Sequence, residues 1–370
     1  MIRNGINMGQ VKKQNRSLVL RYMNSHEGVS RKEIAEATGL TAAAVTQICN
    51  DFLEMGIIKE CGIDDETSGA GRRKVKLSIN SEYGYILGIN IESDVTNVVV
   101  ANLAGEVKKS IQLDTCSEDE LDSFIDKIES FLNEIYESNA HFQDKMIGGC
   151  VAVAGEVDKE KGTSVHAYGI WDKEVSICEM LEDKLGIHFI IENNIDAFAT
   201  AEIVYGTAAK YDNILVIKWG PGVGCSIIID GKIYEGRNGR SAELGHNIVE
   251  QNGIKCSCGR RGCLETKISW KAMQAKRKFK VSEFGDVYRD FADEIDLFAR
   301  TVVNTMSILE PDRVVLSGKL FEEKKVRDEL IKCCESYFKK FNNKRILYTP
   351  LARQEDYIGP IATYIDRELF

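Results

Sequence analysis

The chain has 370 residues, of which 44% are hydrophobic and 28% are charged. This length allows two or three domains with buried cores, and the ordinary charge content argues against global disorder. With 31 glycines and 4 prolines, the chain is neither collagen-like nor of low complexity. The best membrane-span candidate, Ile214–Ile229, is interrupted by Lys218. The basic N-terminal stretch contains no apolar segment, which predicts a cytoplasmic protein without a secretory signal.

Charge is spread unevenly along the chain. Residues 1–80 contain twelve Lys and Arg against nine Asp and Glu, which gives this stretch +3. Because the whole chain carries −9, the remainder carries −12. A basic head on an acidic body suggests that only the head meets a polyanion such as nucleic acid, although +3 alone does not decide this.

The first eighty residues show the pattern of three short helices. Apolar residues at helical spacing predict the first helix over Asn15–Asn24. A second helix starts at Ser30, because Ser30 and Glu33 have the spacing of a capping box. Gly39 suits the left-handed backbone that ends a helix. The third helix, Ala42–Met55, begins after a capping threonine, Thr41.

Two helices joined by a short turn containing glycine are typical of a DNA-binding unit. The exposed start of the third helix carries small residues that permit close approach to a groove. Gln47 can hydrogen-bond a base edge, and the methyl groups of Ala and Thr can contact thymine. The candidate DNA contacts of the helices are Arg31, Thr41, Ala42, Ala43, Thr46 and Gln47.

Two alternating segments, Ile57–Cys61 and Val75–Ile79, follow as the strands of a hairpin wing. The loop between them ends in Arg72 and Arg73, which can contact phosphates or enter the minor groove. A three-helix protein-interaction domain is the alternative. The order of capping box, glycine turn, capped third helix and basic wing favours a winged helix-turn-helix DNA-binding domain over residues 1–80.

The remaining residues, 81–370, predict an α/β body. Strands and helices alternate in a scheme that restarts near residue 214, which indicates two similar lobes around a cleft. We expect one lobe at about 81–196 together with the C-terminal helix, and the other at about 197–355. The predicted elements are strands at Tyr85–Ile91, Val95–Leu103, Met146–Val153, His188–Ile191, Ile214–Lys218, Gly224–Ile229 and Lys232–Tyr234, and helices at Leu121–Tyr136 and about Asp196–Val204.

A cysteine cluster predicts a metal site. Cys256, Cys258 and Cys263 lie among glycines, and His246 precedes them by ten residues. Three thiolates and one imidazole form a closed tetrahedral set for structural Zn²⁺. The alternative is a group of buried cysteines, but the glycines between them suit tight turns around an ion.

These residues resemble a known family. The run from Glu243 to His246 and the cysteine motif through Glu265 are similar to the signature of the ROK family of repressors, open reading frames and sugar kinases. The head and its Gly71-Arg72-Arg73 wing also look like those of ROK repressors, so the resemblance covers about residues 12–365. It implies a two-lobed actin/hexokinase-like, ribonuclease H-like body that binds a sugar in the cleft.

The resemblance also implies a set of sugar-binding residues. Carboxylates and amides suit paired contacts to neighbouring hydroxyl groups. In this sequence Ala154 replaces the family's proline before the glycine turn, and no asparagine occurs in residues 163–173, where the family has one. The positions that match the family's sugar contacts are Gly155, Asn193, Asn194, Glu243, His246 and Glu265.

The residues that the family uses for phosphoryl transfer are less well preserved than those for sugar binding. Asn194 stands where the ROK kinases have their catalytic aspartate, and a carboxamide cannot accept the proton of a sugar hydroxyl. Asp196 would lie roughly 200° away around a helix. Glu92 and Asp94 stand in the first phosphate loop, where they would repel phosphate. The family's triple glycine on the adenosine side is reduced to Ser317-Gly318-Lys319. The glycines of the second phosphate hairpin remain in residues 220–224, but the need for a tight turn would by itself explain them.

The sequence therefore predicts a sugar-responsive transcription regulator, a repressor of carbohydrate uptake or catabolism genes, without kinase activity. It would bind double-stranded operator DNA as a homodimer or homotetramer and would not act at a membrane. One alternative is an ATP-dependent sugar kinase of hexokinase or glucokinase type with an appended DNA-binding domain. Another is a zinc-stabilised scaffold that binds DNA without a ligand.

Overall fold

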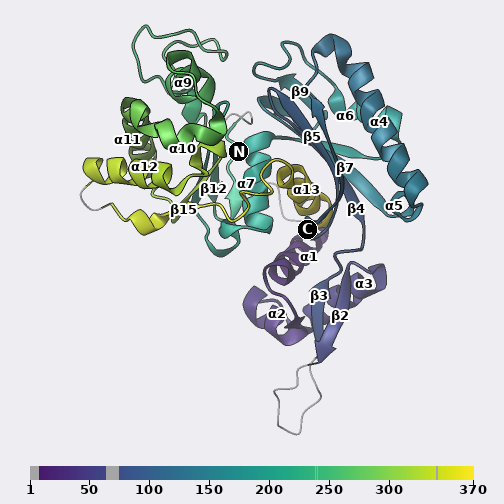
Figure 1. The fold of residues 1–370 in the computed structure, drawn as a ribbon. Coiled ribbons are helices and arrows are strands. Elements are labelled where there is room, and N and C mark those ends of the chain that lie inside the picture. Colours follow the sequence, from purple (N-terminus) through teal and green to yellow (C-terminus); the bar gives the residue numbers. More distant parts are fainter. Residues whose placement is uncertain (1–7, 64–74, 238, 240, 339–340) are drawn as a thin grey trace.

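The computed structural model describes residues 8–63, 75–237, 239, 241–338 and 341–370 (Figure 1). A small head of three helices and a short sheet lies below two larger α/β lobes. Each lobe is built on a five-stranded sheet. Among the described residues, no helix is both long enough and apolar enough to cross a bilayer.

The head has the three predicted helices and the two predicted strands in the predicted order, and it has a further two-residue strand before the second helix that was not predicted. Its strands form an antiparallel sheet in the order β1-β3-β2. The helices bury Leu20, Ile34 and Phe52 against Leu77 of the sheet. The first helix starts earlier than the apolar pattern indicated. The elements are α1 (Met8–Ser25), β1 (Val29–Ser30), α2 (Arg31–Thr38), α3 (Ala42–Met55), β2 (Ile58–Ile63) and β3 (Val75–Ile79).

Side-chain caps fix the ends of the two short head helices. Ser30 Oγ accepts from the backbone N–H of Glu33 at 3.3 Å, and the Glu33 carboxylate accepts from the N–H of Ser30 at 2.7 Å. Gly39 ends α2 with φ 68°, in the left-handed region. Thr41 Oγ1 accepts from the N–H of Ala44 at 3.2 Å and so starts α3. These contacts confirm the predicted helix boundaries around the turn.

The first lobe contains a mixed sheet in the order β10-β7-β4-β5-β6. Strands β4, β5 and β6 are antiparallel, whereas β7 and β10 run parallel to β4. One face packs against α4 and α6, and the other against α7 and α13. The elements are β4 (Tyr85–Ile91), β5 (Val95–Asn102), β6 (Val107–Asp114), α4 (Leu121–Ser138), α5 (His141–Asp144), β7 (Met146–Val153), β8 (Glu156–Asp158), β9 (Thr163–His166), α6 (Ile177–Leu185), β10 (Phe189–Asn193), α7 (Asn194–Val204) and α13 (Ile358–Tyr364).

The second lobe repeats this scheme with the order β13-β12-β11-β14-β15. Its core centres on Trp219, whose ring packs edge-on against Phe298 and Phe321 with centroids 5.1 Å away in each case. The elements are β11 (Ile214–Trp219), β12 (Val223–Ile229), β13 (Lys232–Ile233), α8 (Glu265–Ile268), α9 (Trp270–Lys276), α10 (Phe284–Val287), α11 (Ala292–Leu309), β14 (Arg313–Ser317), α12 (Lys324–Tyr337) and β15 (Ile346–Tyr348).

The two sheets share one strand order, in which an antiparallel hairpin is extended by two parallel crossover strands. This confirms the repeat that the restart near residue 214 indicated. Helix α7 begins at Asn194, two residues earlier than the sequence predicted. The cause is Asn193, whose Oδ1 accepts from the N–H groups of Ile195 and Asp196 and caps the helix.

The head contacts the body through α1. Arg21 forms an ion pair of 2.7 Å with Asp366 near the C-terminus, and Nδ2 of Asn24 donates to the main-chain oxygen of Val204 at the end of α7. Helix α1 lies next to the C-terminal end of the chain in Figure 1. The head is therefore attached to the first lobe at the end of two of its helices.

Candidate functional site

A cavity of about 280 Å³ opens between the two lobes. It is lined from both sides, by the carboxyl ends of β4 and β10 and by the hairpin between β11 and β12. Ligands commonly bind at such strand ends in α/β folds. The structure brings all six residues of the predicted sugar set to this cavity: Gly155, Asn193, Asn194, Glu243, His246 and Glu265.

Asn193 and Gly155 form the floor on the first lobe. Asn193 Nδ2 donates to the main-chain oxygen of Gly155 at 2.7 Å, while its Oδ1 caps α7. Gly155 has φ 122°, and a Cβ atom there would lie 2.1 Å from the main-chain oxygen of His166. Only glycine fits this turn. The Asn193 side chain is therefore largely committed to holding the backbone around the cleft.

Asn194 is buried and points toward the first strand end. Its Nδ2 donates to Oε1 of Glu92 at 3.1 Å. With that donor engaged, the Oδ1 atom remains as a hydrogen-bond acceptor for a group in the cavity.

Lys218 is a cleft residue that the sequence did not identify as part of the site. It reaches from β11 in the second lobe to Glu92 at 2.9 Å and to Glu355 at 3.3 Å. Burial disfavours its charge, but the two carboxylates outweigh this and raise the pKa of Lys218. The sequence signal was present, since Lys218 is the one charged residue in an otherwise apolar strand. Its partners could not be read from the sequence.

The same network changes the interpretation of the first phosphate loop. Glu92 and Asp94 were expected to repel phosphate there. Burial opposes its ionisation, but Lys218 dominates, so the pKa of Glu92 is lowered and the carboxylate stays charged. Asp94 is likewise paired, with Lys271 of α9 at 3.2 Å. Both acidic side chains of the loop are thus bound to lysines of the opposite lobe.

Asp196 also lines the cavity, although its angle from Asn194 around a helix predicted a poor substitute for the base. Its Oδ1 accepts from Ser226 Oγ at 2.6 Å. Burial, with the nearby Glu192 charge, raises the pKa of Asp196 to about 7. A carboxyl group poised in this range can either donate or accept a hydrogen bond near neutral pH.

Glu243 and Glu265 contribute carboxylates from the second lobe. Glu265 is half-buried, and its Oε2 accepts from the N–H of Val223 at 3.0 Å. Burial raises the pKa of Glu265, the Val223 N–H opposes that effect, and the Glu243 charge adds to it. A Cβ atom at Gly222 would lie 2.6 Å from Oε2 of Glu265. The glycine in this hairpin is therefore needed for the approach of Glu265.

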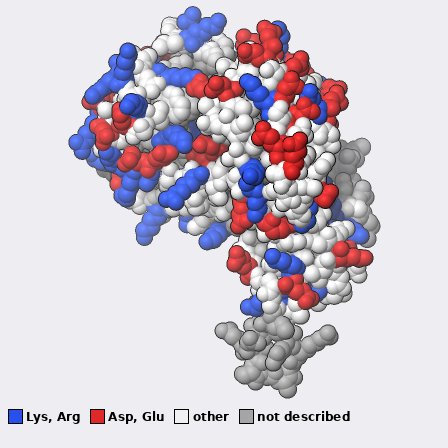
Figure 2. All heavy atoms as spheres, turned by 45° about the vertical axis from the view of Figure 1, so that its right-hand side comes forward, with Lys and Arg blue, Asp and Glu red and all other residues white. Residues whose placement is uncertain are grey.

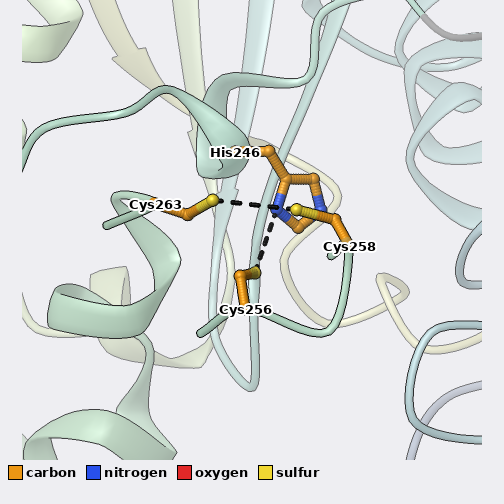
Figure 3. Close-up of side chains that lie close together, drawn as sticks. All are labelled: His246, Cys256, Cys258 and Cys263. Atoms are coloured by element: carbon orange, nitrogen blue, oxygen red, sulfur yellow. Dashed lines mark hydrogen bonds between the residues drawn. The ribbon is translucent and has the colours of Figure 1, made fainter. Parts of the chain in front are cut away.

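His246 lines the cavity, and Figure 3 shows its ring beside the side chains of the cysteine cluster. Its Nδ1 lies 3.5 Å from Cys256 Sγ, whereas its Nε2 lies 3.4 Å from Oε2 of Glu243. Burial, followed by the charge of Arg260, lowers the pKa of His246, which favours the neutral imidazole that binds metals. One ring thus faces the cluster with one nitrogen and the cavity carboxylate with the other.

The four side chains of the cluster form a compact donor set. Their ligand atoms, from His246, Cys256, Cys258 and Cys263, all lie within 4.8 Å of one another. Cys258 Sγ and Cys263 Sγ are 3.7 Å apart. A tetrahedral ion with metal–sulfur bonds of about 2.3 Å separates its sulfur ligands by about 3.8 Å. The donors therefore fit a structural metal ion.

The candidate DNA-binding residues of the head lie on the exposed side of the turn and α3. Ala42, Ala43, Thr46 and Gln47 are exposed, and Thr41 caps the helix. Gln47 Nε2 donates to Asp51 at 2.8 Å, and Arg31 donates to Asn50 at 3.1 Å. Arg72 and Arg73 lie outside the described residues.

The surface charge of the body is mixed on the face seen in Figure 2, where acidic and basic side chains are interspersed. Such a pattern offers no continuous positive surface to a polyanion on this face.

Comparisons with known proteins agree on both parts of the chain. The sequence pattern of the ROK family matches residues 86–361, and that of the MarR family matches residues 13–73. The chain is 30% identical over 303 residues to the xylose repressor of Bacillus subtilis, covering 81% of this chain and 76% of that protein. It is 25% identical over 357 residues to the DNA-binding transcriptional dual regulator NagC of Escherichia coli, covering 89% and 86%.

Solved structures show the same fold. A ROK family transcriptional regulator described as a homologue of Escherichia coli Mlc superposes with a TM-score of 0.77 and 20% identity, covering 95% of each chain. A ROK family glucokinase from Streptomyces griseus, solved with glucose and AMPPNP, superposes with a TM-score of 0.62 and 20% identity, covering 76% of this chain and 98% of that one. The chain belongs to the ROK family, and it carries a MarR-like winged helix in front of the ROK domain.

Proposed function

We propose that this protein is a sugar-responsive transcription regulator, a repressor that binds operator DNA through its winged helix and a sugar in the cleft. The observation that supports it best is a polar cleft without the family's catalytic aspartate, in a chain that also carries a winged helix. Polar groups suited to hydroxyl recognition line the cavity, while Asn194 occupies the base position. The relatives named as xylose repressor and NagC are regulators as well. We also propose that the chain divides into a head of residues 1–80 and a body of residues 81–370, because the two family matches fall in these two parts.

The DNA and sugar functions can be tested together. DNA fragments that bind the full-length protein would be selected from a random pool, and their affinity measured with and without D-xylose or N-acetyl-D-glucosamine. These sugars come first because relatives of this chain are named for them. We expect a selected sequence to bind specifically and one sugar to change its affinity. Absence of any selected sequence would contradict the proposal.

A matched pair of variants separates DNA recognition from head stability. Gln47→Ala removes an exposed side chain from the start of α3, whereas Glu54→Ala changes an exposed residue near the end of the same helix. If α3 reads the operator, the first variant loses about 1–3 kcal/mol of discrimination between bases. The second variant should keep the affinity and specificity of the unmodified protein.

We also propose that the protein has lost phosphoryl transfer. Asn194 cannot act as a base, and the Glu92–Lys218 ion pair fills the region of the first phosphate loop. No release of ADP should therefore exceed background with ATP, Mg²⁺ and a panel of hexoses and pentoses. Turnover would instead support a sugar kinase with an appended head, in which a cleft carboxyl group such as Asp196 would have to act as the base.

The metal is proposed to be Zn²⁺ with a structural role. His246, Cys256, Cys258 and Cys263 would fill all four tetrahedral positions and leave none for chemistry. Metal analysis should find about one zinc per chain. Cys263→Ser should lower the zinc content and the melting temperature, whereas Cys333→Ser, outside the cluster, should change neither. Full zinc content in the Cys263→Ser variant would contradict this ligand set.

We further propose a homodimer or homotetramer in the cytoplasm. A winged helix-turn-helix regulator commonly reads two half-sites, which requires two heads at a fixed spacing. Light scattering of the purified chain gives its mass directly. A monomer with and without selected DNA would contradict this part of the proposal.

A further inference from the structure

The C-terminal turn of the chain lies between the head and the cleft. Residues Ile365–Leu369 continue α13 as a π-helical turn. π-helical turns are rare and often occur at functional positions. Two neighbouring charged residues of this turn contact different parts of the molecule.

Asp366 contacts the head. Its Oδ1 lies 2.7 Å from Nη2 of Arg21 in α1, and the two side chains are 21% and 35% exposed. Burial raises the pKa of Asp366, while Arg21 and then Arg367 oppose this. The pair is partly shielded from water, which makes it stronger than a fully exposed surface pair.

Arg367 contacts the strand that leads into the cleft. Its Nη1 donates to the main-chain oxygen of Ile191 at 3.1 Å, and its Nη2 forms an ion pair with Glu192. Glu192 is 2% exposed, and its Oε1 accepts from the N–H of Asn193 at 2.9 Å. Asn193 in turn caps α7 and lines the cavity. The guanidinium group therefore holds the end of β10, directly before the cleft residues.

Glu192 also links this strand to the opposite lobe. Lys159 lies 2.8 Å from Glu192 and 2.6 Å from Glu235, which follows β13 in the second lobe. A movement of one lobe relative to the other therefore acts on the same carboxylate that Arg367 holds. The Glu192 side chain is 2% exposed and Lys159 is 21% exposed, whereas Glu235 is 53% exposed. Charge-assisted hydrogen bonds such as that between Lys159 and Glu192 are stronger than neutral ones, so this pair resists separation.

We propose that the C-terminal turn Ile365–Leu369 mechanically couples the cleft to the DNA-binding head. When β10 moves, Arg367 would move with it, because it is bound to Ile191 and Glu192. Asp366, the neighbouring residue, would then shift α1 through its ion pair with Arg21. The coupling goes beyond the proposed function and rests on it only for the identity of the input, a sugar. Coupling between two sites is reciprocal, so a change at the head must also change the local stability of β10.

This reciprocity gives a test that needs no ligand. Amide hydrogen exchange would be measured in the full-length protein and in two variants of the head. Arg21→Gln breaks the contact between head and body, whereas Lys32→Gln breaks an ion pair of 3.4 Å with Glu36 within α2. We expect Arg21→Gln to speed exchange in β10 by about threefold or more, and Lys32→Gln to leave it unchanged. Equal exchange of β10 in Arg21→Gln and the unmodified protein would overturn the proposal.

Two further variants guard against general destabilisation. Asp366→Asn removes the same contact from the other side and should reproduce the effect on β10. Arg21→Lys keeps the charge and should restore most of the normal exchange. If the lysine variant exchanged as fast as Arg21→Gln while melting like the unmodified protein, the ion pair would not be the coupling element.

A sugar arm separates this inference from the proposed function. D-xylose and N-acetyl-D-glucosamine would be added to the unmodified protein. If a sugar slows exchange in β10, the coupling requires a change in α1 as well, and Arg21→Gln should abolish only the change in α1. A sugar effect on α1 that survives in Arg21→Gln would overturn the coupling. If neither sugar has any effect, the proposed effectors are wrong, and the ligand-free comparison still decides the coupling.

Discussion

Asn194 illustrates how a single side chain depends on contacts that come from far along the chain. Its amide donates to Glu92, and Glu92 is held by Lys218, 126 positions away. The sequence predicted that Asn194 lies in the cleft, because its motif identified the position. The orientation of its amide could not be predicted, since it depends on the way two lobes fold together.

The first prediction concerns Asn194→Asp. The new carboxylate would face Oε1 of Glu92 in a buried site, while Lys218 is already shared with Glu355. We expect a loss of about 1–3 kcal/mol in the free energy of unfolding at about pH 8, because a buried charge loses its partner. The loss should shrink at about pH 5, where a protonated carboxyl group can donate to Glu92.

Denaturant unfolding at the two pH values measures this loss. Asn343→Asp is the control, because Asn343 also donates to a glutamate, Glu335, at 3.0 Å but is exposed. There the change should stay within about 0.5 kcal/mol. A similar loss at both positions would show that burial in the cleft is not the cause.

The second prediction concerns the titration of Asp196. Burial raises its pKa from the ordinary 3.8 to about 7, so the folded protein binds this proton more tightly than the unfolded chain does. The contribution of Asp196 to stability is therefore complete below about pH 4, falls as the pH rises to about 7, and stays constant above.

Asp196→Asn removes this dependence and can still accept from Ser226. Relative to the unmodified protein, the variant should gain stability as the pH rises between about 4 and 7. Melting temperatures across this range test the expectation, with Asp328→Asn on the exposed side of α12 as the control. A stability difference that does not change with pH would contradict the raised pKa.

At the scale of elements, local signals predicted the head well. Helix α3 spans Ala42–Met55 as predicted, because its N-cap and its terminal glycine, Gly56, are both encoded locally. Helix α1 begins at Met8 instead of Asn15, because its first turns are polar and carry no apolar periodicity. Elements with caps were thus located more accurately than elements that rely on a buried face.

The third prediction concerns the cap of α3. Thr41→Ala removes the oxygen that accepts from the N–H of Ala44, and should cost about 0.5–2 kcal/mol of head stability. Thr41→Ser keeps the hydroxyl group and should behave like the unmodified protein. Hydrogen exchange of α3 amides reports on the head alone. Equal exchange in the alanine and serine variants would show that the cap does not stabilise α3.

At the scale of the whole molecule, the two lobes are joined by ion pairs across the cleft. The pairs are Glu92 with Lys218, Asp94 with Lys271, and Lys159 with Glu235. The sequence predicted the two lobes and the cavity between them from the repeated pattern. The pairs themselves could not be predicted, because each joins residues that meet only when both sheets have formed.

The fourth prediction compares two of these lysines. Lys218 is 12% exposed, and Lys218→Met would leave Glu92 and Glu355 without their shared cation. We expect a loss of about 3–5 kcal/mol in the free energy of unfolding. Lys271 is 55% exposed, so Lys271→Met should change it by less than about 1 kcal/mol. Similar losses in the two variants would contradict the difference that burial is expected to make.

The imidazole of His246 has one edge toward the thiol cluster and the other toward the cavity carboxylate Glu243. Any ion held by the cluster would fix the ring and, through it, the carboxylate. Under the proposed function, stripping the ion with a chelator should therefore weaken sugar binding as well as lower thermal stability. One histidine would then make the affinity for the ligand of the cleft depend on the ion that the thiol cluster holds.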